Sequence, residues 1–189
     1  PVMKGQKSEN EKFAGADYTL SVETFTPVGK AIQGATSHHL GQNFAKAFNI
    51  TFTDQDKQIK HVYQNSWGLS TRAIGIMIMM HSDDKGLVLP PKVADIPVVI
   101  IPIIFKDDKE GVLKEAKKIK SLIKDSLMDD REGYSPGFKF NEWELKGIPI
   151  RIEIGPKDVK KKECILVRRD TNKKQTMKIS SLKKEIPKI

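Results

Sequence analysis

The alternation of hydrophobic and polar residues predicts strands at several places along the chain. The clearest case is the run from Ile148 to Ile154, where isoleucine occupies every second position and more polar residues lie between. The run at 98–105 is continuously apolar, which is typical of a strand that is buried on both faces. Shorter segments with strand-forming residues are 18–25, 31–35, 59–63 and 165–167.

Three further segments predict helices. Thr36 or Ser37 is placed to cap a helix that ends near Phe48. Residues 110–127 carry apolar side chains at helical spacing with lysines between them, as in an amphipathic helix. The third segment begins at Arg72 and contains the run AIGIMIMM at 73–80. This run is apolar on all sides, so periodicity leaves helix and strand open. Its glycine and its unbranched methionines disfavour a strand, and we predict a buried helix.

A boundary is expected at Leu89-Pro90-Pro91-Lys92, because two consecutive prolines cannot continue a helix and force an extended path. We therefore predict two domains, at 1–90 and 91–189. The second has the element order strand, helix, strand, strand, which is typical of a compact mixed domain. The fold class predicted for the whole chain is α/β (α+β).

Positive charge is concentrated after this boundary. The chain has a formal net charge of +9, and residues 93–189 carry 23 Lys or Arg against 16 Asp or Glu. Residues 1–92 carry 10 against 8. The second domain is thus the better candidate for contact with a polyanion. The alternative, which composition alone favours, is a solvated lysine-rich surface.

Other features of the composition narrow the class of protein. Cys164 is the only cysteine, so a disulfide framework and a multi-cysteine zinc site within this chain are excluded, and a reducing compartment is the default. No apolar stretch is long enough to predict a transmembrane helix. The charged first residues lack the apolar core of a secretory signal, and they have the character of the middle of a longer protein.

Four long blocks carry a resemblance to a known family. Three of them, in chain order, are EKFAGADYTLSVETF at 11–25, AIQGATSHHLGQNFAKAF at 31–48 and YQNSWGLSTRAIGIMIMMHSDDKGLVLPPKVA at 63–94. They resemble the C-terminal part of the catalytic domain of eukaryote-type prolyl-tRNA synthetases, a class II family. The fourth, YSPGFKFNEWELKGIPIRIEIGPKD at 134–158, resembles the anticodon-binding domain of that family. The blocks are long and lie in the right order, unlike a lone short motif.

The resemblance implies a fold and an activity. Residues 1–90 would be the C-terminal segment of an antiparallel-sheet class II catalytic domain, including its motif 3. Residues 91–189 would be a small mixed-sheet α/β anticodon-binding domain. The implied activity is ATP-dependent activation of L-proline to prolyl-adenylate, followed by transfer to tRNA(Pro), in the cytoplasm. Such catalysis depends mainly on positioning the reactants and on stabilising charge.

By resemblance, Arg72 is the motif 3 arginine that stacks on ATP and neutralises it, and it is the catalytic candidate. A planar guanidinium suits both tasks. Gln33 and Thr36 match residues that bind the nucleotide. The residues that match the proline pocket are Phe13, His38, Trp67, Gly68 and Ser70, although the family often has threonine where Ser70 stands. We reject a metal site at His38 and His39, because neighbouring strand residues point to opposite faces.

Five residues match positions that contact the anticodon bases, namely Glu144, Arg151, Lys157, Asp158 and Lys173. Arginine and lysine suit the acceptor atoms of the tandem guanines in a proline anticodon, and carboxylates suit the N–H donors. Residues 151–174 contain nine Lys or Arg and four acidic residues, which favours phosphate contact. Lys160, Lys161 and Lys162 are expected in a solvated turn. The sequence leaves Arg168 and Arg169 open between phosphate contact and a structural role.

The family's motifs 1 and 2 precede the region of resemblance. A homodimer through upstream regions and Mg²⁺ ligands outside this segment are therefore expected, with no contact to DNA or a membrane. A truncated paralogue that binds tRNA without charging it is the alternative. A purely structural α/β domain is a weaker one, because it leaves the matched ligand residues unexplained. The retained proline-pocket residues favour the enzyme, since a non-catalytic paralogue has no physical need of them.

Overall fold

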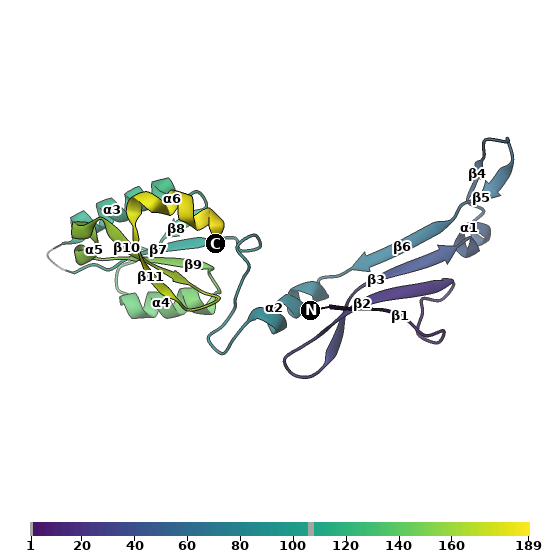
Figure 1. Ribbon diagram of the computed structural model, residues 1–189, viewed down its shortest axis with the longest axis horizontal. Coiled ribbons are helices and arrows are strands. Elements are labelled where there is room, and N and C mark those ends of the chain that lie inside the picture. Colours follow the sequence, from purple (N-terminus) through teal and green to yellow (C-terminus); the bar gives the residue numbers. More distant parts are fainter. Residues whose placement is uncertain (1, 106–107) are drawn as a thin grey trace. The chain divides into compact units, whose positions relative to one another are not determined.

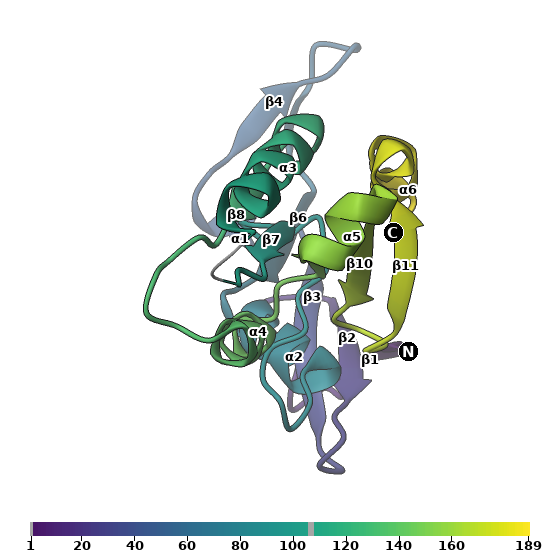
Figure 2. The same ribbon diagram turned by 90° about the vertical axis from the view of Figure 1, so that its left-hand side faces the viewer.

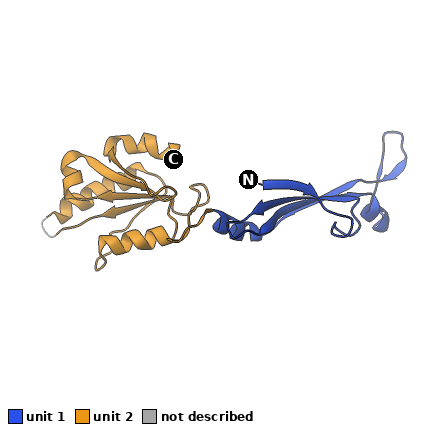
Figure 3. Cartoon of the chain, turned by 60° about the horizontal axis from the view of Figure 1, so that its bottom comes forward, with its two compact units in different colours: residues 1–80 blue, residues 81–189 orange. Residues whose placement is uncertain are grey.

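The computed structural model describes residues 2–105 and 108–189. Within them the chain forms two compact units, residues 1–80 and residues 81–189 (Figure 3). No helix in the described part of the chain is both long enough and apolar enough to cross a membrane. Each unit has its own sheet, and each is described separately below.

The first unit is built on a four-stranded antiparallel sheet with the strand order β1-β2-β3-β6 (Figure 1). A separate two-stranded hairpin consists of β4 and β5. The elements are β1 (Val2–Gln6), β2 (Tyr18–Phe25), β3 (Ala31–Gly41), α1 (Asn43–Ala47), β4 (Thr51–Thr53), β5 (Ile59–His61), β6 (Gln64–Leu69) and α2 (Arg72–His81). The strands predicted at 18–25, 31–35 and 59–63 are confirmed, the second of them as the start of a much longer strand.

The helix predicted from Thr36 or Ser37 to Phe48 is wrong over its first half. Residues 36–41 continue β3, and only Asn43–Ala47 are helical. The physical reason is that β3 is a central strand, paired with β2 on one side and with β6 on the other. Two hydrogen-bonded ladders outweigh the weak preference of a short apolar stripe for a helix.

The predicted helix at 72–80 is confirmed as α2, but the expectation that it is buried is wrong. Ile74 and Met79 are 58% and 42% exposed, and none of the helical residues is fully buried. One contact between the helix and the sheet runs from Thr24 Oγ1 to Met80 Sδ, at 3.8 Å. A helix that is apolar all round is buried only where other elements cover each side of it. Among the described residues of the first unit, the sheet and one short helix do not supply that cover.

The second unit has a five-stranded mixed sheet with the strand order β11-β10-β9-β7-β8. Strand β7 is parallel to both of its neighbours, whereas β9, β10 and β11 are antiparallel to one another. The elements are β7 (Val98–Pro102), α3 (Lys109–Leu122), β8 (Ser126–Met128), α4 (Pro136–Leu145), β9 (Ile150–Ile154), α5 (Pro156–Lys161), β10 (Glu163–Arg168), β11 (Lys174–Lys178), η1 (Ile179–Ser181), α6 (Leu182–Glu185) and η2 (Ile186–Lys188).

Helices cover the two faces of this sheet unequally. Helices α3, α5 and α6 lie on one face and α4 lies on the other (Figures 1 and 2). The larger core, on the first face, contains isoleucines 150, 152 and 154, which are at most 2% exposed. The alternating pattern at 148–154 therefore predicted the buried face of β9 correctly. The opposite face of β9 carries Arg151 and Glu153 and is covered only in part, by α4.

Three predicted elements of this unit differ in extent. The strand expected at 98–105 ends at Pro102, and the one expected at 165–167 is the longer β10. The helix expected at 110–127 ends at Leu122. A turn with Asp125 at φ 60° then leads into β8, and Ser126 Oγ donates to the carbonyl of Ile123 at 2.8 Å. Ile123 is already extended, with φ −116° and ψ 106°, and the positive φ of Asp125 also cannot continue a helix, so the helix ends early.

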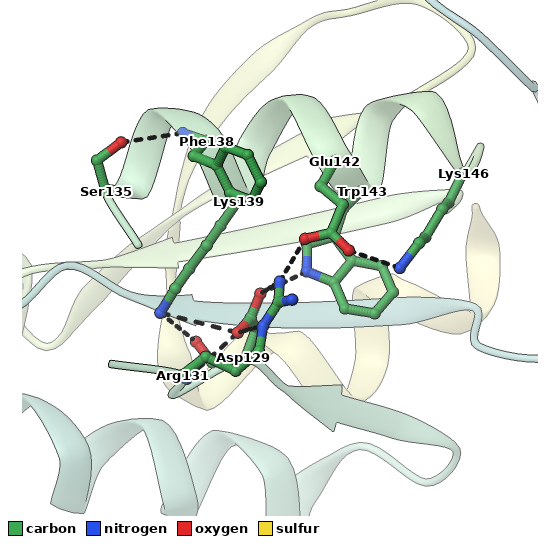
Figure 4. A network of polar contacts seen from close by, with 8 residues as sticks. All are labelled: Asp129, Arg131, Ser135, Phe138, Lys139, Glu142, Trp143 and Lys146. Carbon is green, nitrogen blue, oxygen red and sulfur yellow. Dashed lines mark hydrogen bonds and ion pairs between the residues drawn. The ribbon is translucent and has the colours of Figure 1, made fainter. Parts of the chain in front are cut away.

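A buried carboxylate anchors α4 to the sheet (Figure 4). Asp129 is 2% exposed and accepts hydrogen bonds from Arg131 Nε at 2.8 Å and from Trp143 Nε1 at 2.7 Å. Lys139, which is also buried, donates to the Asp129 carbonyl at 3.1 Å. The helix begins at Ser135, whose hydroxyl accepts from the N–H of Phe138. These bonds fix the helix that supports one of the candidate sites described next.

Candidate functional site

A β-bulge brings three predicted ligand residues to one face of the first sheet. Thr36 lies opposite Ser21 and His38 lies opposite Thr19, so all four side chains share a face. The register then shifts, with the result that Gln33 lies opposite Glu23. Without the extra residue at this bulge, regular alternation would send Gln33 to the opposite face. The bulge therefore places Gln33, Thr36 and His38 in one row.

His38 is held by both nitrogens of its ring. Its Nδ1 lies 2.9 Å from Thr19 Oγ1, and its Nε2 lies 3.2 Å from Thr36 Oγ1. Thr19 is completely buried and also accepts the backbone N–H of Phe13 at 3.0 Å. The Thr19 hydroxyl thus links the histidine ring to the loop that contains Phe13.

The Phe13 ring forms an aromatic wall beside His38. The two ring centroids are 4.8 Å apart, and the Phe13 ring is 47% exposed. The ring of Phe44 also stacks on Phe13, at 6.1 Å between centroids. The result is a small surface with one apolar wall and one polar wall, and such a surface matches a ring that carries a single amine.

The remaining residues predicted for this pocket are placed differently. Gly68 lies directly opposite Thr36 and has open space where a side chain would stand. Trp67 alternates to the other face of the sheet, where it lines a broad apolar hollow with Leu20 and Leu69. The structure therefore brings together Phe13, Thr36, His38 and Gly68, but it does not bring the Trp67 ring to them.

Arg72 and Ser70 lie just beyond the end of β6. Ser70 Oγ accepts the N–H of Arg72 at 3.3 Å, and Arg72 is the first residue of α2. Within residues 2–105 and 108–189, the Arg72 guanidinium forms no ion pair. An exposed, unpaired guanidinium at a helix start is suited to binding an anion.

In the second unit, Arg151 lies on the polar face of β9. Its guanidinium carbon is 4.5 Å from the centre of the Phe140 ring, and its Nε donates to Glu153 Oε1 at 3.0 Å. Glu153 is 3% exposed and also lies 3.6 Å from Lys174 Nζ. Stacking on one side and a carboxylate at the edge fix the plane of the guanidinium.

Glu144 lies in the same small hollow as Arg151, together with Arg168, Arg169 and Asn172. Its carboxylate is 3.3 Å from Lys85 Nζ. Lys173 is exposed and adjoins this hollow through the turn between β10 and β11, where the N–H of Arg168 donates to the Lys173 carbonyl at 3.1 Å. Three of the five predicted anticodon residues therefore lie at one end of the sheet.

The other two lie at the opposite end of β9, on α5. Lys157 is exposed, whereas Asp158 accepts the N–H of Gly155 at 2.8 Å and so caps the start of the helix. The lysines at 160–162 are exposed and close this helix, with Lys162 in the left-handed conformation at φ 58°. The five predicted residues therefore lie at the two ends of β9, and they do not form one cluster.

The two arginines that the sequence left open have different surroundings. Arg169 is 4% exposed and binds Asp83, Gly86 and Glu144, so its role is structural. Arg168 is more exposed and pairs with Asp170 at 2.7 Å. Thr19, Phe140 and Glu153 were missed by reasoning from the sequence. The spacing of Arg151 and Glu153 on one face of a strand is the signal that could have found Glu153.

The acidic, histidine and cysteine residues among those described form no group of three that could hold a metal ion. His39 faces away from His38, stacking on Tyr18 at 5.0 Å and lying 3.3 Å from Asp17. The two neighbouring histidines therefore have separate environments.

Comparison with known proteins covers the whole chain. Residues 97–189 match the family described as "Anticodon binding domain". A proline–tRNA ligase of Natranaerobius thermophilus is 53% identical over 185 residues, which cover 96% of this chain and 38% of that protein. The cytoplasmic proline–tRNA ligase of Arabidopsis thaliana is 50% identical over 195 residues, covering 100% of this chain and 37% of that protein.

A solved structure gives the same result. The prolyl-tRNA synthetase of Cryptosporidium parvum, crystallised with L-proline and AMP, has a TM-score of 0.94 and 50% sequence identity to this chain. The match covers 100% of this chain and 42% of that one, so the chain spans about two fifths of the length of such relatives. The mixed α/β fold predicted from the sequence is confirmed by this likeness. The chain therefore belongs to the prolyl-tRNA synthetase family, and residues 97–189 are its anticodon-binding domain.

Proposed function

We propose that this chain supplies part of the ATP and proline site, and the anticodon-reading surface, of a proline–tRNA ligase. The observation that carries the proposal is the row of Gln33, Thr36 and His38 beside Phe13, in a chain about 50% identical to proline–tRNA ligases over its whole length. The relative crystallised with L-proline and AMP supports the same ligands here. One relative is named as cytoplasmic, and we propose that location for this protein too.

In the proposed reaction the proline carboxylate attacks the α-phosphate of ATP, which forms prolyl-adenylate and releases pyrophosphate. A ribose hydroxyl at the end of tRNA(Pro) then attacks the activated carboxyl and displaces AMP. Neither step requires a strong general base from this segment. The task of the protein is to hold the reactants in line and to offset the negative charge that develops.

Each predicted site residue of the first unit then has a distinct role. Arg72 stacks on the nucleotide and neutralises it, because its guanidinium is exposed and unpaired among the described side chains. Thr36 and Gln33 hydrogen-bond the nucleotide. Phe13 and His38 contact the pyrrolidine ring, and Gly68 leaves room beside Thr36. Ser70 supports the helix start that carries Arg72.

For Trp67 we propose a role different from the proline contact that the sequence predicted. Its ring lies on the far face of the sheet, so we propose that it does not touch proline through its side chain. The hollow that it lines is mostly apolar and includes Leu20, Val22 and Leu69. In a protein of the length of the relatives, other parts of the catalytic domain are proposed to cover this face. Mg²⁺ is proposed to accompany ATP, with its ligands outside this segment.

In the second unit, the predicted residues at the two ends of β9 are proposed to read the anticodon of tRNA(Pro). Among the residues that the structure describes, Nη1 of Arg151 has no partner, and the plane of the guanidinium is fixed by Phe140 and Glu153. A fixed, planar donor suits the two acceptors on the edge of guanine. We propose that Lys157 and Lys173, near opposite ends of β9, contact the neighbouring nucleotides, with Glu144 and Asp158 as acceptors. Unpaired loop bases expose these edges to the protein.

Two substitutions in the complete protein separate these roles. Arg72→Ala is expected to abolish proline-dependent ATP–pyrophosphate exchange, with Arg72→Lys as the control that keeps the charge but not the plane. Arg151→Ala is expected to leave exchange intact and to weaken tRNA charging. Lys118→Ala, which removes one charge from the far side of the same unit, controls for net charge. Normal pyrophosphate exchange in Arg72→Ala would refute the proposed role of Arg72. A complete protein that binds tRNA(Pro) but shows no exchange at all is instead the non-catalytic tRNA-binding module.

A further inference from the structure

Thr19 occupies a key position in the candidate proline site without belonging to the predicted set. It is 0% exposed, and its hydroxyl lies between the backbone N–H of Phe13 and the Nδ1 of His38. Phe13 and His38 are the two walls of the proposed proline pocket. The buried Thr19 hydroxyl is therefore hydrogen-bonded to both of these residues.

The arrangement of donors and acceptors assigns the hydrogen on the histidine ring. The Phe13 N–H can only donate, so Thr19 Oγ1 accepts this bond. The hydroxyl hydrogen of Thr19 then needs an acceptor, because a buried donor without one is costly. Among the residues that the structure describes, His38 Nδ1 is the acceptor within reach, at 2.9 Å. In a neutral imidazole, Nε2 must then carry the hydrogen.

This assignment extends to the ligand side. Nε2–H lies 3.2 Å from Thr36 Oγ1 and donates to it. The Thr36 hydroxyl, having accepted this bond, keeps its own hydrogen available for an acceptor atom of a ligand. If Nδ1 carried the hydrogen instead, Nε2 would compete with the ligand for the Thr36 hydroxyl.

We propose that Thr19 is a positioning residue of the amino-acid site, which fixes the Nε2–H tautomer of His38, the orientation of its ring and the position of the Phe13 backbone. The inference rests on the proposed function only for the identity of the ligand. The tautomer and the position of Phe13 follow from the contacts of Thr19 alone.

Two matched variants of the complete protein test it. Thr19→Val keeps the shape of the side chain and removes the hydroxyl, whereas Thr19→Ser keeps the hydroxyl. In proline-dependent pyrophosphate exchange, Thr19→Val is expected to raise the KM for proline about tenfold, in line with the loss of a buried hydrogen-bond network. The effect on the KM for ATP is expected to be smaller, because Thr19 is linked to the proposed nucleotide-binding residues indirectly, through His38 and Thr36. Thr19→Ser is expected to restore the KM for proline.

Neutron diffraction from crystals of the complete protein gives a readout that is independent of activity. Deuterium on Nε2 of His38 and none on Nδ1 supports the proposal, and deuterium on Nδ1 overturns it. Equal proline KM values for Thr19→Val and Thr19→Ser also overturn it, because packing and not the hydroxyl would then matter. If Thr19→Val fails to fold, the wild-type tautomer and the Thr19→Ser kinetics still decide. A wild-type protein without proline-dependent exchange refutes the proposed function but leaves the tautomer test valid.

Discussion

Arg169 and Asp83 form a two-pronged ion pair across 86 residues of sequence, with Nη1 and Nη2 of the guanidinium 2.8 Å and 2.5 Å from the two carboxylate oxygens. The Arg169 side chain is 3% exposed, and its other donors bind the carbonyls of Gly86 and Glu144. This pairing holds the pKa of Asp83 well below its usual range. It fastens the segment at residues 83–89 to the rest of the second unit.

Loss of this pair should destabilise the second unit measurably. Asp83→Ala leaves a buried guanidinium without its carboxylate, which costs roughly 3 kcal/mol, at the low end for buried pairs because solvent reaches Asp83. Urea unfolding, followed by fluorescence of Trp143, measures the change. Asp170→Ala is the matched control, because the Arg168–Asp170 pair has similar geometry on an exposed surface, where a pair contributes below about 1 kcal/mol. Equal losses in the two variants would contradict the structural role of Arg169.

At Gly86, the segment at residues 83–89 packs tightly against the end of α4. Gly86 has φ 129°, and a Cβ there would lie 2.5 Å from the Leu145 carbonyl oxygen. Gly86→Ala should therefore destabilise the unit by at least about 1–3 kcal/mol, from strain and displacement of the backbone. Gly111→Ala is the control, since Gly111 lies in α3 with open space around it. There, alanine should stabilise by up to about 1 kcal/mol. Thermal unfolding midpoints that move in the same direction for both would refute the steric argument.

Much of the fold could be predicted from local pattern. The isoleucines at alternate positions of β9 identified both a strand and its buried face, because one covered sheet face demands that period. The sequence did not reveal that Ser37 and His38 continue a strand, because that depends on ladders to β2 and β6. Helix α4 was also missed. It packs on the sheet through Phe140 and Trp143, and the polar contacts of Asp129 with Trp143 and Lys139 also hold it in place. Hydrophobic periodicity does not show such polar contacts.

Local sequence pattern was also insufficient to predict the arrangement of the candidate site. Resemblance selected Gln33, Thr36 and His38, and the structure gathers them on one face by a bulge that no residue pattern announces. It also places the Trp67 ring on the other face, and alternation from Gly68 could have indicated this. Thr19 was invisible in the sequence because its importance lies in two hydrogen bonds to distant groups.

The carboxylate of Asp129 should make stability depend on pH in the acid range. Burial raises its pKa, but hydrogen bonds from Arg131 and Trp143 and the charge of Lys139 outweigh burial and leave the pKa at about 2, against an ordinary 3.8. A lowered pKa stabilises the folded state above pH 3.8, and this contribution is lost as pH falls through about 2. The shift corresponds to roughly 2 kcal/mol.

Asp129→Asn tests this contribution. The variant should be less stable than the wild type at pH 7, and the gap should narrow between about pH 4 and pH 2, as the wild-type carboxylate takes up a proton. Urea titrations at a series of pH values provide the measurement. Glu132→Gln serves as the control, because Glu132 is exposed and pairs with Lys109 at the surface. A gap that stays constant down to pH 2 would show that Asp129 acts through packing rather than charge.

Cys164 should be unreactive in the folded protein. The thiol is 0% exposed, and burial, together with Asp158 and Glu163, raises its pKa to about 12. At pH 8 only about one thiol in ten thousand is then ionised, and the thiolate is the reactive form. Iodoacetamide should therefore leave Cys164 unmodified in the native protein and alkylate it fully in urea, as mass spectrometry of its peptide would show. Ser180→Cys, at an exposed position, provides a rapidly labelled internal reference. Labelling of native Cys164 as fast as this reference would mean that the core around β10 opens far more readily than its packing indicates.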